Sequence, residues 1–325
     1  MQVGIVGCGL TGHKRAESLP PGYLRAVADV SRERAEELAG KFPGADPYTD
    51  WQEMIRRKDL NLIIVSTPNK WLAPITLAAV NSGKHVLVEK PGARHFSELD
   101  PVIEAAERQG VKVAVGYNLR CHPSFIKARE IIRNGDLGPV MYIRGRYGHG
   151  GRPGYEKEWR ADPAISGGGE LLDQGVHLID LSRWFLGDIS RVQGAVHTYY
   201  WDMPVEDNGF MYLKTDAGQV AWLQVSCTEW KNLFSFEILC ERGKLQIDGL
   251  GGSYGTERMT LYRMLPQMGP PETTIWEYPF PDTSWKTEFE NFVQAIRGNT
   301  IHKPGLRDAQ EALRIIAHIY GEGAV

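Results

Sequence analysis

Short apolar runs alternate with segments of helical hydrophobic spacing along the first 117 residues. An uninterrupted apolar run is typical of a parallel strand covered on both faces, because neither side of such a strand meets water. Glycines at 40, 83 and 110 follow helical segments, as C-terminal helix caps do. The pattern predicts strands at 2–6, 23–28, 62–66, 85–88 and 111–115, and helices at 11–18, 31–41, 50–57, 75–82 and 97–109. We therefore expect a doubly wound α/β domain with a parallel sheet over residues 1–117.

Residues 118–325 have a different pattern, in which strand-like runs follow one another with short turns between them. Turns at 216–218 and 241–243 separate neighbouring runs, which favours antiparallel pairing. The pattern predicts helices at 124–133, 170–186, 284–297 and 306–320, and strands at 140–147, 192–200, 209–213, 219–228, 234–239 and 244–247. We therefore expect a second domain built on an antiparallel sheet, with the C-terminal helix packing back on the first domain.

Composition narrows the class of protein. The chain has 325 residues, of which 42% are hydrophobic and 24% charged, with a net charge of −3, as in an ordinary globular protein, and its length favours two domains. This charge argues against nucleic acid or an anionic membrane as a partner. The first strand begins at once, so we expect no signal peptide and a cytoplasmic location. The four cysteines are far apart, which predicts free thiols and no metal site.

A glycine-rich turn follows the first strand and carries the clearest chemical signal. Gly7, Gly9 and Gly12 form a GxGxxG pattern. In this pattern Gly7 allows a tight turn, Gly9 allows a pyrophosphate to approach the backbone, and Gly12 allows the helix to pack closely on its strand. The next apolar run ends in Asp29, about twenty residues on, where a carboxylate meets an adenosine ribose. Because a carboxylate repels a 2′-phosphate, NAD is favoured over NADP. Arg32 is placed to stack on adenine or to pair with a phosphate.

Two further clusters suggest catalytic side chains. Lys90 follows the apolar run 85–88 in Glu89-Lys90-Pro91, where a parallel strand would end beside a bound cofactor. On spacing alone, a solvated surface lysine is an equal alternative. Asp173 and His177 are four residues apart after three glycines, so a helix would place them on one face, where a carboxylate orients an imidazole base. A histidine that is merely hydrogen-bonded is the alternative for this cluster.

The segment 144–160 is rich in arginines and aromatic residues, which together can clamp a phosphorylated or diphosphate-linked sugar. A solvated loop with a few cofactor contacts is the alternative. The residues concerned are Arg144, Arg146, Tyr147, His149, Arg152, Tyr155, Trp159 and Arg160.

Taken together, these motifs resemble the family of glucose-fructose oxidoreductase, inositol dehydrogenase and their relatives. The resemblance covers essentially the whole chain and is carried by the segments 7–12, 67–69, 89–91, 116–118 and 167–177. It implies an N-terminal Rossmann domain followed by an α/β domain with a large open antiparallel sheet. It also implies a homodimer or homotetramer formed through that sheet. One departure is visible, since many relatives have a histidine where this chain has Leu72.

The resemblance also implies roles for individual residues. Lys90 matches the family's motif lysine beside the nicotinamide, and Asp173 and His177 match its substrate-facing pair. With the glycine turn included, the expected cofactor-binding residues are Gly7, Gly9, Leu10, Thr11, Gly12, Asp29, Arg32, Ser66, Thr67, Pro68, Asn69, Glu89, Lys90, Asn118, Trp159 and Arg160. The expected substrate-binding residues are Lys90, Asn118, Arg120, Tyr147, Arg152, Asp173 and His177.

These residues predict an NAD-dependent oxidoreductase that acts by hydride transfer, and the resemblance implies that it oxidises a ring hydroxyl of a sugar. His177, oriented by Asp173, would take the hydroxyl proton while Lys90 stabilises the developing alkoxide, although Lys90 and His177 could exchange roles. The arginine-rich segment favours a nucleotide-linked sugar, such as a UDP-hexose or UDP-N-acetylhexosamine oxidised at C3. An NAD-dependent glycosidase of the same fold and a non-catalytic NAD-binding regulator are the alternatives, and the regulator has no need to keep all three catalytic residues.

Overall fold

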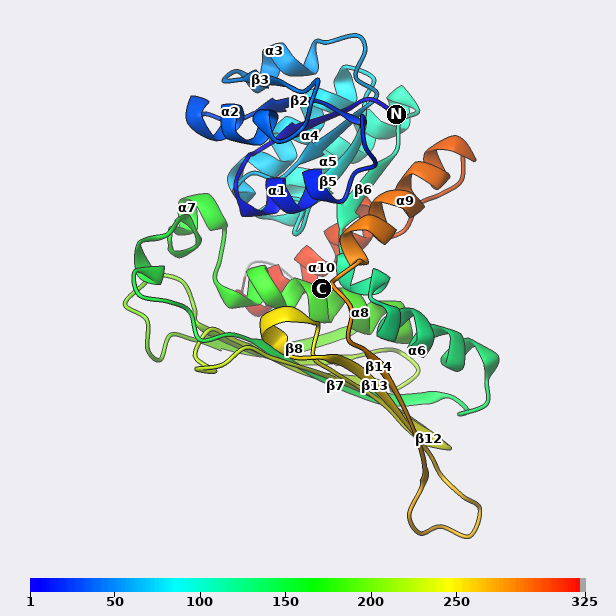
Figure 1. Ribbon diagram of the computed structural model, residues 1–325. Helices are drawn as coiled ribbons and strands as arrows, with labels where there is room; N and C mark the ends of the chain where they lie inside the picture. The colour runs from blue at the N-terminus through cyan, green and yellow to red at the C-terminus, as the bar shows by residue number, and fades with distance from the viewer. Residues whose placement is uncertain (322–325) are drawn as a thin grey trace. The chain divides into compact units, whose positions relative to one another are not determined.

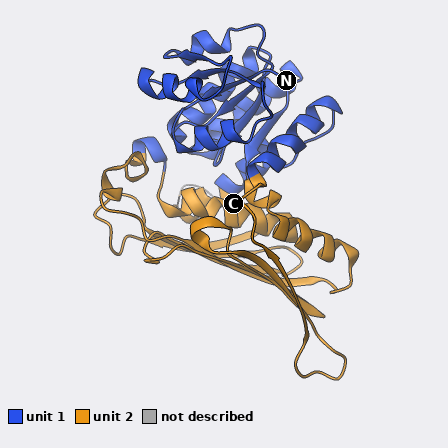
Figure 2. Ribbon diagram, viewed as in Figure 1, with its two compact units in different colours: residues 1–117, 164–167, 285–313 blue, residues 118–163, 168–284, 314–325 orange. Residues whose placement is uncertain are grey.

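A computed structural model of the chain describes residues 1–321 and shows two compact units (Figures 1 and 2). Unit 1 contains residues Met1–Tyr117, Ala164–Gly167 and Trp285–Leu313, and unit 2 contains Asn118–Pro163, Gly168–Ser284 and the described residues from Arg314 onward. Within residues 1–321, no helix has both the length and the apolar character needed to cross a membrane.

Unit 1 is built on a six-stranded sheet in the order β3-β2-β1-β4-β5-β6, with every pair of neighbours parallel. The strands are β1 (Val3–Val6), β2 (Leu24–Ala28), β3 (Asp46–Tyr48), β4 (Leu62–Val65), β5 (His85–Glu89) and β6 (Val113–Gly116). The predicted parallel sheet is confirmed. The edge strand β3 was not predicted, because Asp46 and Pro47 are exposed and no apolar run marks it.

The helices of unit 1 follow the predicted alternation. They are α1 (Leu10–Glu17), α2 (Arg32–Gly40), α3 (Trp51–Ile55), α4 (Asn69–Asn81), the 3₁₀ turn η1 (Phe96–Leu99) and α5 (Asp100–Gln109). Most of the short helix α7 (Pro163–Ser166), which was not predicted, also belongs to this unit. Helix α4 starts six residues earlier than position 75, the predicted start, and contains Pro74. Because proline usually interrupts a helix, the sequence pattern placed the start of this helix after Pro74. In the structure the turn before Pro74 is also helical, and its Leu72 is buried in the core.

Residues from the C-terminal part of the chain complete the core of unit 1. Helix α9 (Ser284–Arg297) contributes Phe289 and Phe292, which are 1% and 0% exposed and pack with Val3 and Ile5 of the central strand. Helix α10 (Leu306–Ile319) follows, and its residues up to Leu313 belong to the same unit. The first and last parts of the sequence thus share one hydrophobic core.

Unit 2 is built on an eight-stranded sheet in the order β14-β13-β12-β11-β7-β10-β9-β8. Its strands are β7 (Val140–Gly148), β8 (Arg191–His197), β9 (Asn208–Lys214), β10 (Val220–Ser226), β11 (Leu233–Cys240), β12 (Gly243–Asp248), β13 (Glu257–Arg263) and β14 (Glu272–Tyr278). The large antiparallel sheet is confirmed, with one exception: β7 lies between β10 and β11 and pairs with β10 in parallel. Strands β13 and β14 were not predicted. Strand β14 lies at the edge of the sheet and is mostly exposed, so no apolar pattern marks it.

Helices cover one face of this sheet and leave the other open (Figure 1). On the covered face, Phe125 of α6 (Pro123–Asn134) and Phe185 of α8 (Val176–Leu186) pack on Phe236 of β11. On the opposite face, Tyr142 and Trp222 are 37% and 65% exposed. Short turns complete the unit: the 3₁₀ turns η2 (Asn118–Cys121), η3 (Tyr155–Lys157), η4 (Trp159–Ala161) and η6 (Gly252–Tyr254), and a π-helical turn, η5 (Leu171–Gly175).

Candidate functional site

The glycine turn of unit 1 has the geometry of a phosphate cradle. Gly7 has a φ of +96°, and a Cβ at Gly12 would lie 2.0 Å from the Gly7 carbonyl oxygen, so α1 can pack this close to β1 only with glycine there. Gly9 caps α1 in an extended conformation without any side-chain hydrogen bond to the first helical N–H groups. A Cβ at Gly9 would have no atom within 4 Å. The helix N-terminus therefore presents N–H groups and open space, which fits a dinucleotide pyrophosphate.

Asp29, at the end of β2, reaches back to this turn. Its carboxylate accepts hydrogen bonds from the N–H groups of Cys8 (2.8 Å) and Ser31 (2.9 Å). Burial, and then the charge of Asp29, raise the pKa of the Cys8 thiol to about 12, so this cysteine is an inert packing residue. Arg32 is exposed and pairs with Glu36 at 3.5 Å. Asp29 therefore fixes the shape of the cradle, in addition to its predicted contact with the ribose.

The residues after β4 form the next part of the cradle. The Ser66 hydroxyl donates to the Gly7 carbonyl oxygen at 2.8 Å, and so joins this segment to the glycine turn. The Asn69 amide donates to the Ser166 carbonyl oxygen at 2.8 Å. The Thr67 hydroxyl is buried and has no hydrogen-bond partner among the described residues. Because an orphaned buried hydroxyl is costly, it is well suited to bond a ligand at this edge of the sheet.

Lys90 lies directly after β5, at the same carboxyl edge of the parallel sheet. The preceding residue, Glu89, is 7% exposed, and its carboxylate accepts a hydrogen bond from the Arg15 guanidinium of α1. The Gly92 N–H donates to the Glu89 carbonyl oxygen at 2.9 Å, so Lys90 and Pro91 occupy a tight turn. Sequence patterns missed Arg15, since nothing marked it apart from other helix residues.

In unit 2, Asp173 lies in the π-helical turn η5 and His177 near the start of α8. The Arg160 guanidinium donates to the Asp173 carboxylate at 3.2 Å, and it also stacks on the Trp159 ring at 4.6 Å. The burial of His177 is nearly complete, with 5% of the residue exposed. Single π-helical turns are frequent at functional sites, because they re-aim side chains within a helix.

An aromatic residue, Tyr147, lies beside the histidine and next to a second one, Tyr254. The ring centroid of Tyr147, on β7, lies 6.0 Å from that of His177 and 5.5 Å from that of Tyr254. Burial, and then the neighbouring Tyr254 and Asp173, raise the pKa of Tyr147 well above its usual value of 10. Burial raises the pKa of Tyr254 to about 12. Both phenols therefore remain neutral hydrogen-bonding groups at any physiological pH.

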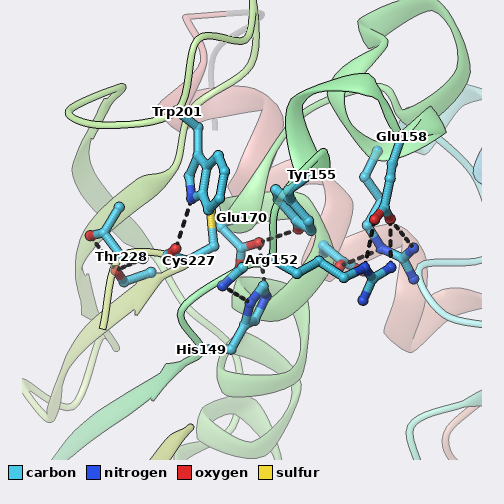
Figure 3. A network of polar contacts seen from close by, with 12 residues as sticks. His149, Arg152, Tyr155, Glu158, Glu170, Trp201, Cys227 and Thr228 are labelled. Atoms are coloured by element: carbon cyan, nitrogen blue, oxygen red, sulfur yellow. Dashed lines mark hydrogen bonds and ion pairs between the residues drawn. The ribbon is translucent and has the colours of Figure 1, made fainter. Parts of the chain in front are cut away.

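A buried carboxylate, Glu170, organises the segment before Asp173 (Figure 3). Glu170 is 2% exposed; it accepts a hydrogen bond from the Tyr155 hydroxyl at 2.9 Å and lies 3.3 Å from Nε2 of His149. Burial lowers the pKa of His149, but the bond and charge of Glu170 outweigh it, so that this pKa is raised. The three-glycine pattern drew attention to this segment, but the partners of Glu170 lie too far away in sequence to be predicted.

Three predicted site residues have partners inside unit 2. The Asn118 amide donates to the Ser284 hydroxyl at 2.8 Å, and the buried Arg120 binds Asp180 of α8 through two hydrogen bonds of 2.7 and 2.6 Å. Arg152 forms a similar two-bond pair with Glu158, at 2.7 and 2.8 Å (Figure 3). These bonds give each side chain a role in the framework. Their predicted contacts with cofactor or substrate stay predictions.

Comparison with known protein families matches both halves of the chain. Residues 1–117 match the model of the oxidoreductase family with an NAD-binding Rossmann fold, and residues 125–246 match the model of the GFO/IDH/MocA C-terminal domain. The chain belongs to the GFO/IDH/MocA oxidoreductase family. The resemblance inferred from the motifs is thus confirmed, as is NAD as the cofactor of the Rossmann domain.

Several members of this family are similar to the chain. Levoglucosan dehydrogenase from Pseudarthrobacter phenanthrenivorans is 29% identical over 67% of the chain, and the matched part is 59% of that enzyme's length. Inositol 2-dehydrogenase from Rubrobacter xylanophilus is 28% identical over 77% of the chain and 72% of the enzyme. The solved structure of levoglucosan dehydrogenase in complex with NADH has a TM-score of 0.88 and 22% identity, over 99% of this chain and 96% of that one. This last similarity shows that the fold is shared.

Substitution of Gly9 tests the cradle directly. Because a Cβ at Gly9 meets open space in the protein, Gly9→Ala is expected to change the free energy of unfolding by less than about 1 kcal/mol. The same methyl group would stand where the pyrophosphate approaches, so the affinity for NAD⁺ should fall at least about tenfold. Calorimetric titration with NAD⁺ measures this. Gly40→Ala, also in open space at the end of α2, is the matched control and should bind normally.

The His149–Glu170 pair predicts a pH-dependent contribution to stability. The folded-state pKa of His149 is raised above 6.5, so its contribution is complete below that pH and is lost as the pH rises through the folded pKa. His149→Gln should therefore lower the free energy of unfolding more at about pH 5.5 than at about pH 9. Tyr155→Phe removes a bond from the same carboxylate but no titrating group in this range, so its effect should be equal at both pH values. An equal effect of His149→Gln would contradict the prediction.

Proposed function

We propose that the protein is an NAD-dependent dehydrogenase that oxidises a ring hydroxyl of a sugar or cyclitol by hydride transfer. The observation that carries the proposal is the place of Lys90 at the carboxyl end of β5, in the sheet whose central strand leads into the glycine cradle. Only β4 separates β1 from β5, so this edge places Lys90 about 10 Å from the first turn, within the reach of a dinucleotide. The dehydrogenase names of the relatives support the same reaction type.

Each of four residues has one task in this proposal. NAD supplies the hydride acceptor. Lys90 donates a hydrogen bond to the substrate oxygen and stabilises the charge that develops when the proton leaves. His177 accepts the hydroxyl proton, and Asp173 holds the imidazole in the required orientation. Arg160, which is bonded to Asp173, fixes the carboxylate in turn.

The contacts of Arg152 favour an uncharged ring as substrate. A diphosphate group would need the guanidinium that Glu158 already binds through two hydrogen bonds. One aromatic ring, that of Tyr147, lies 6.0 Å from the His177 ring, and aromatic faces suit the C–H faces of a sugar ring. A UDP-hexose or UDP-N-acetylhexosamine oxidised at C3 is the second candidate, favoured by the number of arginines at 144–160.

A substrate panel tests the proposal. The purified protein is mixed with NAD⁺ or NADP⁺ and with myo-inositol, levoglucosan, D-glucose, UDP-glucose or UDP-N-acetylglucosamine, and NADH absorbance is followed. A glycoside arm measures sugar release. NADH formed from a free sugar or cyclitol is the expected result, and NADH formed only from UDP-sugars favours the second candidate. Sugar release without net NADH would replace the proposal with the glycosidase alternative, and NAD⁺ binding without any turnover would favour the regulator.

Lys90→Met should reduce kcat about 10²–10⁴-fold, because the methionine keeps the length of the side chain but cannot stabilise an alkoxide. The affinity for NAD⁺ should stay within about threefold, since the cradle is unchanged. Steady-state kinetics on the substrate found by the panel measure the first value, and calorimetry measures the second. Lys58→Met, at an exposed position of the same unit, is the control. Full turnover by the Lys90 variant would remove this residue from the mechanism.

We also propose that the open face of the eight-stranded sheet pairs with a second copy of the chain, giving a homodimer or a homotetramer. Trp222 of β10 is 65% exposed on this face, in register with Tyr212 and Arg144 on the neighbouring strands. A large exposed aromatic residue on a sheet face favours an interface. Trp222→Glu should therefore lower the mass measured by light scattering below that of the wild type, to a monomer if the wild type is a dimer, whereas Trp71→Glu, at an exposed position on α4, should not change the mass. A wild-type monomer at micromolar concentration would contradict the proposal.

A further inference from the structure

Helix α1, which forms the cradle, carries an arginine with no exposed surface. The Arg15 guanidinium donates from Nε to the Glu89 carboxylate at 2.5 Å and from Nη1 to the Glu288 carboxylate at 2.6 Å. The Trp285 ring lies 4.4 Å from its Cζ atom. Arginine is almost never fully buried unless it is paired, and here one cation is held between two carboxylates and an aromatic face.

The energetics of this group make its position well defined. Burial alone would lower the pKa of Arg15, but the charges of Glu89 and Glu288 outweigh it and raise this pKa, so that the guanidinium stays charged. The guanidinium fork is planar and rigid, and each carboxylate is held in a fixed direction. Loss of either ion pair of Arg15 would leave part of its buried charge without a compensating carboxylate. Movement of Glu89 away from Arg15 is therefore costly.

A glycine on the neighbouring strand β6 leaves space for the ion pair of Arg15 and Glu89. Glu89 is paired in register with Gly116, the last residue of β6. A Cβ at Gly116 would lie 2.6 Å from Nη2 of Arg15 and 3.1 Å from Oε2 of Glu89. Any other residue at this position would push the two side chains apart. The strand end, the helix and the glycine therefore form one local arrangement.

We infer that Arg15 is a positioning residue for Lys90, an inference that rests on the role of Lys90 in the proposed function. The strand β5 ends at Glu89, so its backbone ladder stops just before Lys90. Beyond the end of the strand, two hydrogen bonds position the backbone beside Lys90. The Gly92 N–H donates to the Glu89 carbonyl oxygen, and the Arg15 guanidinium donates to the Glu89 carboxylate. Since Arg15 belongs to the helix of the cradle, it sets the direction of Lys90 relative to the cofactor-binding turn.

The two carboxylates of Arg15 provide a matched test. Glu89→Gln and Glu288→Gln each remove one charge from the same arginine and keep the shape of the side chain. If Arg15 positions Lys90, Glu89→Gln should lower kcat at least about tenfold with the affinity for NAD⁺ within about threefold, and Glu288→Gln should keep kcat within about twofold. If Arg15 only fastens helix α9, the two variants should lose stability and activity in parallel, and that result would overturn the inference.

A second readout needs no substrate. Reductive methylation with ¹³C-formaldehyde gives each lysine a dimethylamine resonance, and the Lys90 resonance is identified by its loss in Lys90→Met. We expect this resonance to shift in Glu89→Gln and to stay in place in Glu288→Gln. Equal shifts, or none in either variant, would overturn the inference. A shift in Glu89→Gln together with full turnover by Lys90→Met would instead keep the positioning and reject the proposed function.

Gly116→Ala provides a variant in which no charge is altered. The added methyl group enters the space between Arg15 and Glu89, so the Lys90 resonance and kcat should change as they do in Glu89→Gln. This variant also tests the inference if Glu89→Gln fails to fold. A Gly116→Ala protein with normal kcat and an unmoved resonance would count against the inference.

Discussion

The close contact between α1 and the carboxyl end of β1 is the constraint on which the rest of unit 1 depends. With Gly12 at the crossing point, the helix backbone can approach the Gly7 carbonyl oxygen, where a Cβ would come within 2.0 Å. This approach points the helix N-terminus at the edge where all six parallel strands end, and it brings Arg15 to Glu89. One backbone contact thus creates the phosphate cradle and also fixes the strand end that carries Lys90.

Sequence patterns predict this part of the fold because its signals are local. Uninterrupted apolar runs mark buried parallel strands, and the glycine turn is specified within six residues. Signals weaken at the edges of sheets, where β3 and β14 are exposed and lack an apolar pattern. The parallel pairing of β7 with β10 joins strands that are far apart in the sequence, so no local sequence pattern predicts it.

The candidate site shows a similar division. Residue types and spacing drew attention to Lys90, Asp173 and His177, but they could not show which polar side chains hold others in place. Arg120 binds Asp180 across 60 residues, and Arg15 binds Glu288 across 273. Such pairs depend on the three-dimensional fold, so an arginine expected at the substrate was found bonded within the framework.

Both units use a buried carboxylate shortly before a proposed catalytic side chain. In unit 1, Glu89 precedes Lys90 and is held by Arg15; in unit 2, Glu170 precedes Asp173 by one helical turn and is held by Tyr155 and His149. A buried carboxylate is stable only with its hydrogen bonds made, so it tolerates little movement of the backbone that carries it. The more exposed residue that follows is thereby fixed at its backbone. This arrangement separates the residues that fix the backbone from those that carry out the proposed chemistry.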